Sequence, residues 1–296
     1  PRFYKDLKAV KLQRQASSSQ LQFLKFLKQI QQEAGFKIIY EVDDVVFKED
    51  IPDYNKFKFA FDTEEIRSNC IEMINMVDEV TVTCPYMRDL YKKRTGQDKI
   101  SVIPNFVPDF WMGNKFDGRK VVKDDFEGVR DYIRATVDKY QWIFVGAYPP
   151  QLVDLVTSGK IEFYRWQNLL QYPQFIANLN AQLMIAPLQN NSFNKAKSDI
   201  KFIEACTLGI PCLCQDMETY YTAPGSLKFG SVQELSDKVD SILNWKNRSK
   251  YYKSVYTLRG IGEKRILELE PNIGSHLEAL NTKFGDPKRK FIPLWQ

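Results

Sequence analysis

The residues best suited to chemistry lie between Asn194 and Asp216, where the chain reads NKAKSDIKFIEACTLGIPCLCQD. The pattern predicts a basic polar turn, then a helix that carries one acid, Glu204, and then a short apolar strand after a Gly-Ile-Pro corner. Ser198 or Asp199 is expected to cap this helix, because a short side-chain oxygen accepts from the first backbone N–H groups.

Three lysines, Lys195, Lys197 and Lys201, crowd the start of the predicted helix. Cations at the positive end of a helix dipole cost a few tenths to ~1 kcal/mol each. The lysines therefore either form a solvated basic face or await an anion. Exposed backbone N–H groups beside lysines suit a phosphate or a diphosphate.

A second candidate group is Asp43-Asp44, which follows the apolar, β-branched segment 36–42. Taken alone, two aspartates after a strand form a turn or a helix cap. In an open α/β sheet, however, ligands bind beyond the carboxyl ends of the strands. His276 is the only histidine and has no nucleophile in its sequence context, which argues against a Ser-His-Asp mechanism.

The elements that must position these groups alternate between short apolar strands and helices, the rhythm of a doubly wound α/β fold. The predicted strands cover 9–14, 36–42, 79–83, 100–103, 142–145, 161–164, 181–186 and 211–214. The predicted helices cover 17–34, 63–77, 86–94, 126–140, 174–179, 198–208 and 232–245, and a further one covers 250–267, interrupted at Gly260 and Gly262.

Two α/β domains are expected, because 296 residues exceed the usual size of one core. We place the N-terminal domain at 1–107 and the C-terminal domain at 108–270. Residues 271–296 form an extension that could pack back on the first domain. Residues 108–125 lack any period and are interpreted as a linker.

Composition indicates a soluble, cytoplasmic globular protein, with 44% hydrophobic residues and no apolar run long enough to span a bilayer. The five cysteines lack neighbours that would complete a zinc site, and we expect them to be reduced and buried. A net charge of +5 permits a polyanionic partner without requiring one. Because the chain begins at Pro1 without Met, we expect an N-terminal piece to precede it.

Three stretches together resemble one family: KIIYEVDDVVF at 37–47, ISVIPNFV at 100–107 and NKAKSDIKFIEACTLGIP at 194–211. In this order they are similar to retaining glycosyltransferases of the GT-B architecture, family 4-like, in a branch frequent in bacteria and tailed phages. The resemblance implies an α/β fold in which two Rossmann-like domains face each other across a cleft. It also implies a nucleotide-sugar donor, usually a UDP-sugar, held mainly by the C-terminal domain, with no metal required.

Carried over by motif, the resemblance implies a donor site and a catalytic pair. Glu204 would hydrogen-bond the ribose hydroxyls. The catalytic pair would be Asp43 and Asp44, in contact with the transferred sugar or the acceptor hydroxyl, and one of them could act as a base. The remaining donor-binding residues, most of them around the diphosphate, would be Lys197, Ser198, Asp199, Ile200, Lys201 and Gly146.

The sequence departs from the family pattern at three places. Ala196 stands where the family often has a first acid, and Asp199 is the nearby acid that could substitute for it. The basic residue usual after the glycine strand of the second domain is absent at 145–148. A glycine-rich strand and loop expected just before Phe126 is missing as well, and we interpret this as residues dropped near 118–122.

The acceptor stays open at the level of sequence. One hypothesis is a phage enzyme that modifies hydroxymethylated bases, with double-stranded DNA as partner and base flipping to expose the hydroxyl. A second is surface-polysaccharide synthesis, and a third, of a different class, is a non-catalytic nucleic-acid-binding protein on the same fold. Binding of a nucleotide sugar would separate the first two from the third.

Overall fold

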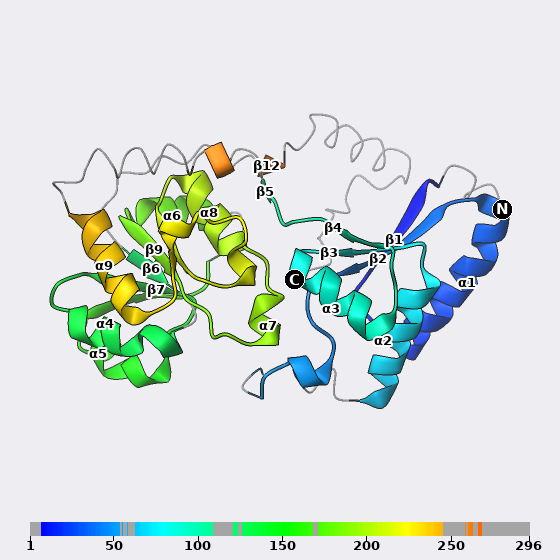
Figure 1. Ribbon diagram of the computed structural model, residues 1–296, viewed down its shortest axis with the longest axis horizontal. Helices are drawn as coiled ribbons and strands as arrows, with labels where there is room; N and C mark the ends of the chain where they lie inside the picture. Colours follow the sequence, from blue (N-terminus) through cyan, green and yellow to red (C-terminus); the bar gives the residue numbers. More distant parts are fainter. Residues whose placement is uncertain are drawn as a thin grey trace, which may run out of the picture.

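The structure is a computed structural model, and the part of the chain that it describes is residues 7–53, 55, 58, 63–108, 121–123, 126–167, 171–244, 258, 260–262 and 266–267. Two parallel sheets, each with its own core, lie side by side along the long axis of the molecule (Figure 1). Among the described residues, no helix is long and apolar enough to cross a membrane.

The first half is a four-stranded parallel sheet in the order β1-β2-β3-β4. Its strands are β1 (Ala9–Gln13), β2 (Lys37–Val42), β3 (Glu79–Val82) and β4 (Ile100–Val102). Its helices are α1 (Ser18–Ala34), α2 (Glu64–Met76) and α3 (Pro85–Thr95), and η2 (Lys48–Asp50) is a short 3-10 turn. Each sequence-predicted element of this half is confirmed to within about two residues.

Local chemistry explains where these helices begin and end. Ser17 caps α1 and forms a capping box with Gln20, and Thr63 caps α2 by accepting from the backbone N–H of Ile66. Gly35 and Gly96 end α1 and α3 in the left-handed region, at φ of 71° and 76°, where a residue without a side chain avoids strain.

The second half is a six-stranded parallel sheet in the order β11-β10-β9-β6-β7-β8. Its strands are β6 (Val121–Lys123), β7 (Trp142–Val145), β8 (Ile161–Tyr164), β9 (Leu183–Ala186), β10 (Cys212–Gln215) and β11 (Lys228–Phe229). Its α-helices are α4 (Arg130–Thr136), α5 (Val153–Thr157), α6 (Tyr172–Asn178), α7 (Ser192–Lys195), α8 (Ile200–Leu208) and α9 (Val232–Leu243). Its 3-10 turns are η5 (Glu127–Val129), η6 (Pro150–Leu152), η7 (Glu218–Tyr220) and η8 (Gly225–Leu227).

The position of β6 corrects the interpretation of residues 108–125 as a linker. Val121–Lys123 pairs with both β7 and β9 and so lies in the middle of the second sheet. The strand expected before Phe126 is therefore present, while the inference that residues were dropped near 118–122 stays a prediction, since 109–120 lie outside the described residues. A strand of only three residues, flanked by charged residues, is too short to show the alternation of apolar and polar residues that marks a strand in the sequence.

The C-terminal part of the described chain also differs from expectation. Residues 258 and 260–262 are helical, so Gly260 and Gly262 are themselves helical residues where we expected an interruption. Ile266–Leu267 forms strand β12, not helix, and pairs in parallel with β5 (Val107–Pro108). The predicted extension at 271–296 lies outside the described residues.

The five cysteines are all free and buried, as expected. Cys212 and Cys214 point to the same side of β10, with their Sγ atoms 3.7 Å apart. No group of three or more metal-ligating side chains occurs within the described residues.

Candidate active site

A cleft of about 450 Å³ lies between the two halves of the molecule. Asp43 and Asp44 line it from the first half, immediately after β2. Residues of the second half line the rest of it, namely Val145, Tyr172, Met184, Ile185, Ala186, Pro187, Leu188, Lys197, Ser198, Ile200, Lys201 and Tyr220.

The topology explains why a cleft forms at this place. In the second sheet the chain runs from β6 outward to β7 and β8, and then crosses to the other side of β6 for β9, β10 and β11. The strand order therefore reverses between β6 and β9, which is the switch point. Val145 ends β7, and the segment 184–188 includes the end of β9. Ligands of open α/β sheets bind beyond the carboxyl ends of the strands at such a switch point.

Asp43 and Asp44 form the acidic wall of the cleft. Arg14, a residue that the sequence pattern did not single out, holds the two aspartates in place. Nη1 of Arg14 lies 2.7 Å from Oδ2 of Asp44, and Nε lies 3.3 Å from Oδ1 of Asp43. Partial burial alone would lower the pKa of Arg14, but the hydrogen bond to Asp44 and the charges of both aspartates outweigh it, and the pKa is raised. The guanidinium thus stays charged and holds both carboxylates at the mouth of the cleft.

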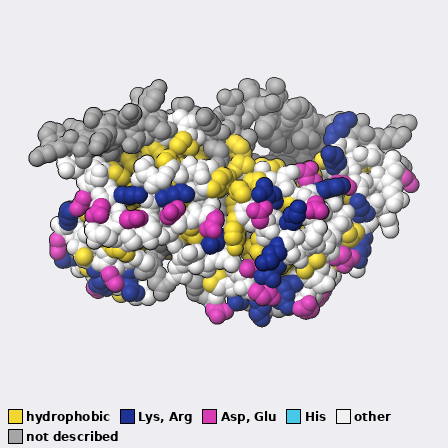
Figure 2. Space-filling view, viewed as in Figure 1, with side chains coloured by type: hydrophobic (Ala, Val, Ile, Leu, Met, Phe, Trp, Pro, Cys, Tyr) yellow, Lys and Arg dark blue, Asp and Glu magenta, His cyan; other side chains and the backbone are white. Residues whose placement is uncertain are grey.

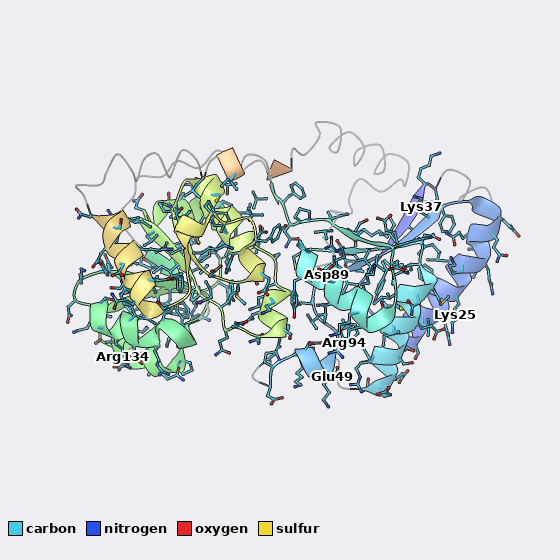
Figure 3. All side chains as sticks on the ribbon, viewed as in Figure 1. Lys25, Lys37, Glu49, Asp89, Arg94 and Arg134 are labelled. Atoms are coloured by element: carbon cyan, nitrogen blue, oxygen red, sulfur yellow. The ribbon has the colours of Figure 1, made fainter. Side chains whose placement is uncertain are left out.

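Further contacts fix the backbone of this acidic loop. The buried hydroxyl of Tyr91 donates to the carbonyl of Asp44 at 2.8 Å and accepts from the N–H of Val46 at 3.2 Å. Arg94, on the same helix α3, pairs with Asp50 at 2.7 Å, beside Glu49 in Figure 3. The segment that follows the two aspartates is therefore tied to α3 at both ends.

The basic wall is the start of α8. Lys197, Ser198, Ile200 and Lys201 all line the cleft there. Nζ of Lys197 also lies 5.5 Å from the centre of the Phe193 ring. The N-terminus of a helix carries partial positive charge, so this wall offers two ammonium groups, a hydroxyl and the helix dipole to an anion.

Lys195 does not belong to the basic wall. It pairs with Glu218 at 2.9 Å, and this contact raises the pKa of Lys195 and lowers that of Glu218. Of the three lysines that crowd the helix start in the sequence, two face the cleft and one is neutralised elsewhere.

The expected side-chain cap of α8 is not formed. Asp199 occupies the N-cap position without a capping hydrogen bond, and its buried carboxylate instead accepts from the hydroxyl of Thr222 at 2.5 Å. Ser198 instead accepts from the amide of Asn105. Because Asp199 turns away from the cleft and Ala196 is buried in the first core, neither supplies the acid that the family often has.

Glu204 lies one turn beyond Lys201 on α8, behind the cleft lining. Its Oε2 atom is fully buried and has no hydrogen-bond partner among the described residues. Burial raises the pKa of Glu204 to about 7, and the charge of Lys201 opposes the shift only in part. A buried acceptor without a donor costs ~1–3 kcal/mol, which a ligand hydroxyl could recover.

Gly146 follows β7 with a φ of 88° and is covered by the indole of Trp166, which is 67% exposed. A Cβ at this position would lie 2.6 Å from the ring. Of the nine predicted site residues, six line the cleft, while Asp199, Glu204 and Gly146 lie outside its lining. Tyr172 and Tyr220 line it and were missed, since nothing in their sequence context distinguishes them from core aromatics.

Figure 2 shows what surrounds this junction on one face of the molecule. Hydrophobic side chains gather along the boundary of the two halves, and Ile103 and Phe106, in the connection after β4, are 54% and 40% exposed. Lysine and arginine side chains are mixed with acids on both flanks. On this face there is no continuous basic surface among the described residues.

Comparisons with known proteins identify the architecture. No family model and no curated protein matches the chain. Among solved structures, HepE of Anabaena in complex with UDP-glucose superposes with a TM-score of 0.55 at 14% identity, over 88% of this chain and 77% of HepE. The pneumococcal O-GlcNAc transferase GtfA, in complex with UDP and GlcNAc, matches with a TM-score of 0.51 at 12% identity, over 90% of this chain and 60% of GtfA.

TarM matches with a TM-score of 0.52 at 14% identity, over 85% of this chain. The match covers 51% of TarM, so the chain spans about half the length of that protein. At this level of identity the likeness concerns the fold. The parallel sheets and these neighbours together show that the chain has the GT-B fold, with two Rossmann-like domains, as the resemblance of its motifs implied.

Proposed function

We propose that the protein is a glycosyltransferase that uses a nucleotide-sugar donor. The observation that carries the proposal is the pairing of the two cleft walls, with Asp43 and Asp44 on one side and Lys197, Ser198 and Lys201 on the other. The HepE and GtfA structures contain UDP-glucose or UDP with GlcNAc, which supports a UDP-sugar as the donor.

In this proposal the basic wall binds the diphosphate. Negative charge grows on the diphosphate as it leaves, and fixed cations with a helix N-terminus stabilise that charge without the need for a metal. Glu204 would accept hydrogen bonds from the ribose hydroxyls through Oε2, which has no partner within the part of the chain that the structure describes. We expect the uridine to lie on the second domain, because the carboxyl ends of β7 and β9 line the cleft.

We propose transfer with retention at the anomeric carbon. The bond from C1 to the diphosphate oxygen breaks, and a bond from C1 to the acceptor oxygen forms on the same face of the sugar. The acceptor proton passes to the departing phosphate, which leaves as the nucleoside diphosphate. Asp43 and Asp44 would hold the sugar or the acceptor hydroxyl, and Arg14 would keep the pair in place.

The acceptor is a hydroxyl compound that the cleft does not identify. A hydroxymethylated base in double-stranded DNA stays a prediction, as do a surface glycan and a role limited to nucleic-acid binding. The mixed charge at the junction in Figure 2 lends no support to a DNA surface on that face.

A thermal-shift screen against UDP- and GDP-sugars tests the proposal. Binding to the native state raises the melting temperature by mass action, whereas a pure nucleic-acid-binding protein would not respond. We expect a UDP-sugar to stabilise the protein and to be hydrolysed slowly, with NMR showing the released sugar first as the anomer of the donor. If no nucleotide and no nucleotide sugar raises the melting temperature, the proposal is refuted.

A further inference from the structure

A hydrogen bond connects the two halves of the molecule at the cleft. Asn105 lies in the connection that runs from β4 to β5 between the halves (Figure 1). Its Nδ2 donates to Oγ of Ser198 at 2.8 Å. Ser198 is a cleft-lining residue, so the contact joins the connection between the halves to a group of the basic wall.

The chain on either side of Ser198 is held in place. Ala196 is buried in the first core, and the thiol of Cys84 donates to its carbonyl at 3.5 Å. On the other side, the carboxylate of Asp199 is bound by Thr222 within the second half. The backbone at Ser198 therefore lies between two anchored neighbours, and with its oxygen bound to Asn105 the hydroxyl hydrogen can still rotate.

That rotation is restricted by Asn105. A serine hydroxyl has one hydrogen to donate and two lone pairs. Because an Nδ2–H of Asn105 occupies a lone pair, the hydroxyl hydrogen must point to another acceptor. An anion in the cleft between Lys197 and Lys201 is such an acceptor.

We propose that Asn105 is a positioning residue, which orients the Ser198 hydroxyl as a hydrogen-bond donor to a diphosphate oxygen. This inference rests on the proposed function, since it assigns a group to the diphosphate site. It also makes the anion site depend on the connection between the two halves, because Asn105, which sets the polarity of Ser198, lies in that connection.

A double-mutant cycle at Asn105 and Ser198 tests the proposal. Calorimetry measures the affinity of each variant for UDP and for inorganic pyrophosphate. Asn105→Asp keeps the size of the side chain but offers only acceptors, so the Ser198 hydrogen would turn toward the aspartate and away from the ligand. We expect Ser198→Ala to weaken binding of both ligands about tenfold to a hundredfold, in line with the loss of one hydrogen bond to a charged group.

The Ser198→Ala background separates polarity from charge. Asn105→Asp adds a negative charge near the anion in either background. Only where Ser198 is present does it also turn the hydroxyl hydrogen of that residue away from the anion. We expect its effect on affinity to be at least threefold larger in the Ser198 background than in the Ser198→Ala background. Asn105→Ala, which introduces no charge, should weaken binding in the Ser198 background alone.

Equal effects of Asn105→Asp in both backgrounds would overturn the inference, since Asn105 would then only join the two halves. In that case the binding of UDP by the wild-type protein would leave the proposed function intact. Failure of the wild-type protein to bind either UDP or pyrophosphate would overturn both proposals. Melting temperatures of all variants, measured without ligand, control for loss of folding.

Discussion

Nη1 of Arg14 lies 2.7 Å from Oδ2 of Asp44, and this contact joins the ends of two adjacent parallel strands. Gln13 pairs with Glu41 in the register of β1 and β2, so both chains leave the sheet at the same edge. Two neighbouring carboxylates repel each other, and the guanidinium between them offsets that repulsion. The acidic wall is thus a unit of three side chains from two strands.

Replacing either aspartate with asparagine is expected to reduce glycosyl transfer at least about a hundredfold, the usual contribution of a positioned acid or base. The affinity for UDP should change less than threefold, because the diphosphate lies on the opposite wall. Single-turnover transfer rates and calorimetry measure the two effects. Glu41→Gln is the matched control, since Glu41 lies on the same strand, pairs with Lys11 at 2.6 Å and does not line the cleft.

Three lysines of one segment give a sharper test of the basic wall. Lys197→Met and Lys201→Met should each weaken UDP binding about tenfold, and the effect should shrink as salt screens the lost interaction. Lys195→Met removes the same charge from the same segment, but Lys195 is paired with Glu218 and lies outside the lining. Its affinity for UDP should stay within twofold of wild type, and a tenfold loss there would contradict the assignment.

Sequence periodicity was sufficient for most of the fold because the strands are short, apolar and separated by capped helices. It failed at β6, where Val121–Lys123 is too short and too charged to show a strand pattern, although it lies between two strands of the second sheet. Long-range pairing, which the local pattern does not contain, stabilises it there.

Within the site, the motifs predicted which segments meet but not how individual side chains point. Asp199 and Ser198 are both short polar residues at a helix start, yet one is bound by Thr222 and the other by Asn105, and these partners are distant in sequence. Arg14 could have been found from the sequence, because it is the last residue of a predicted strand, and the next predicted strand ends just before Asp43. Tertiary contacts alone identify Tyr91 and Asn105.

Gly146 and Gly159 form a matched pair for testing the role of a glycine near the cleft. Both have positive φ, 88° and 75°, but only Gly146 lies against another side chain, the indole of Trp166. Gly159→Ala should cost about 1 kcal/mol in the free energy of unfolding, from backbone strain alone. Gly146→Ala should cost more and displace Trp166, which urea denaturation and tryptophan fluorescence would show. Equal losses would indicate that the indole moves away freely.

Glu204 makes the stability of the protein depend on pH. Its pKa rises from 4.5 to about 7 in the folded state, so the folded protein holds this proton more tightly than the unfolded chain. The stabilisation is fully present below about pH 4.5 and is lost as the pH rises through 7. Glu204→Gln, which cannot ionise, should therefore be more stable than wild type at pH 8, by on the order of 1–3 kcal/mol, and close to wild type at pH 5.

We also expect Glu204 to release a proton when the donor binds. Ribose hydroxyls that donate to Oε2 would favour the carboxylate and lower the pKa of Glu204. Calorimetry of UDP binding at pH 6.5 in buffers of different ionisation enthalpy should detect up to about three quarters of a proton released from Glu204 per UDP by the wild-type protein. Glu204→Gln should release fewer protons than the wild-type protein, only those from the terminal phosphate of UDP, and should bind UDP more weakly. Release of the same number of protons by both proteins would exclude Glu204 as the ribose ligand.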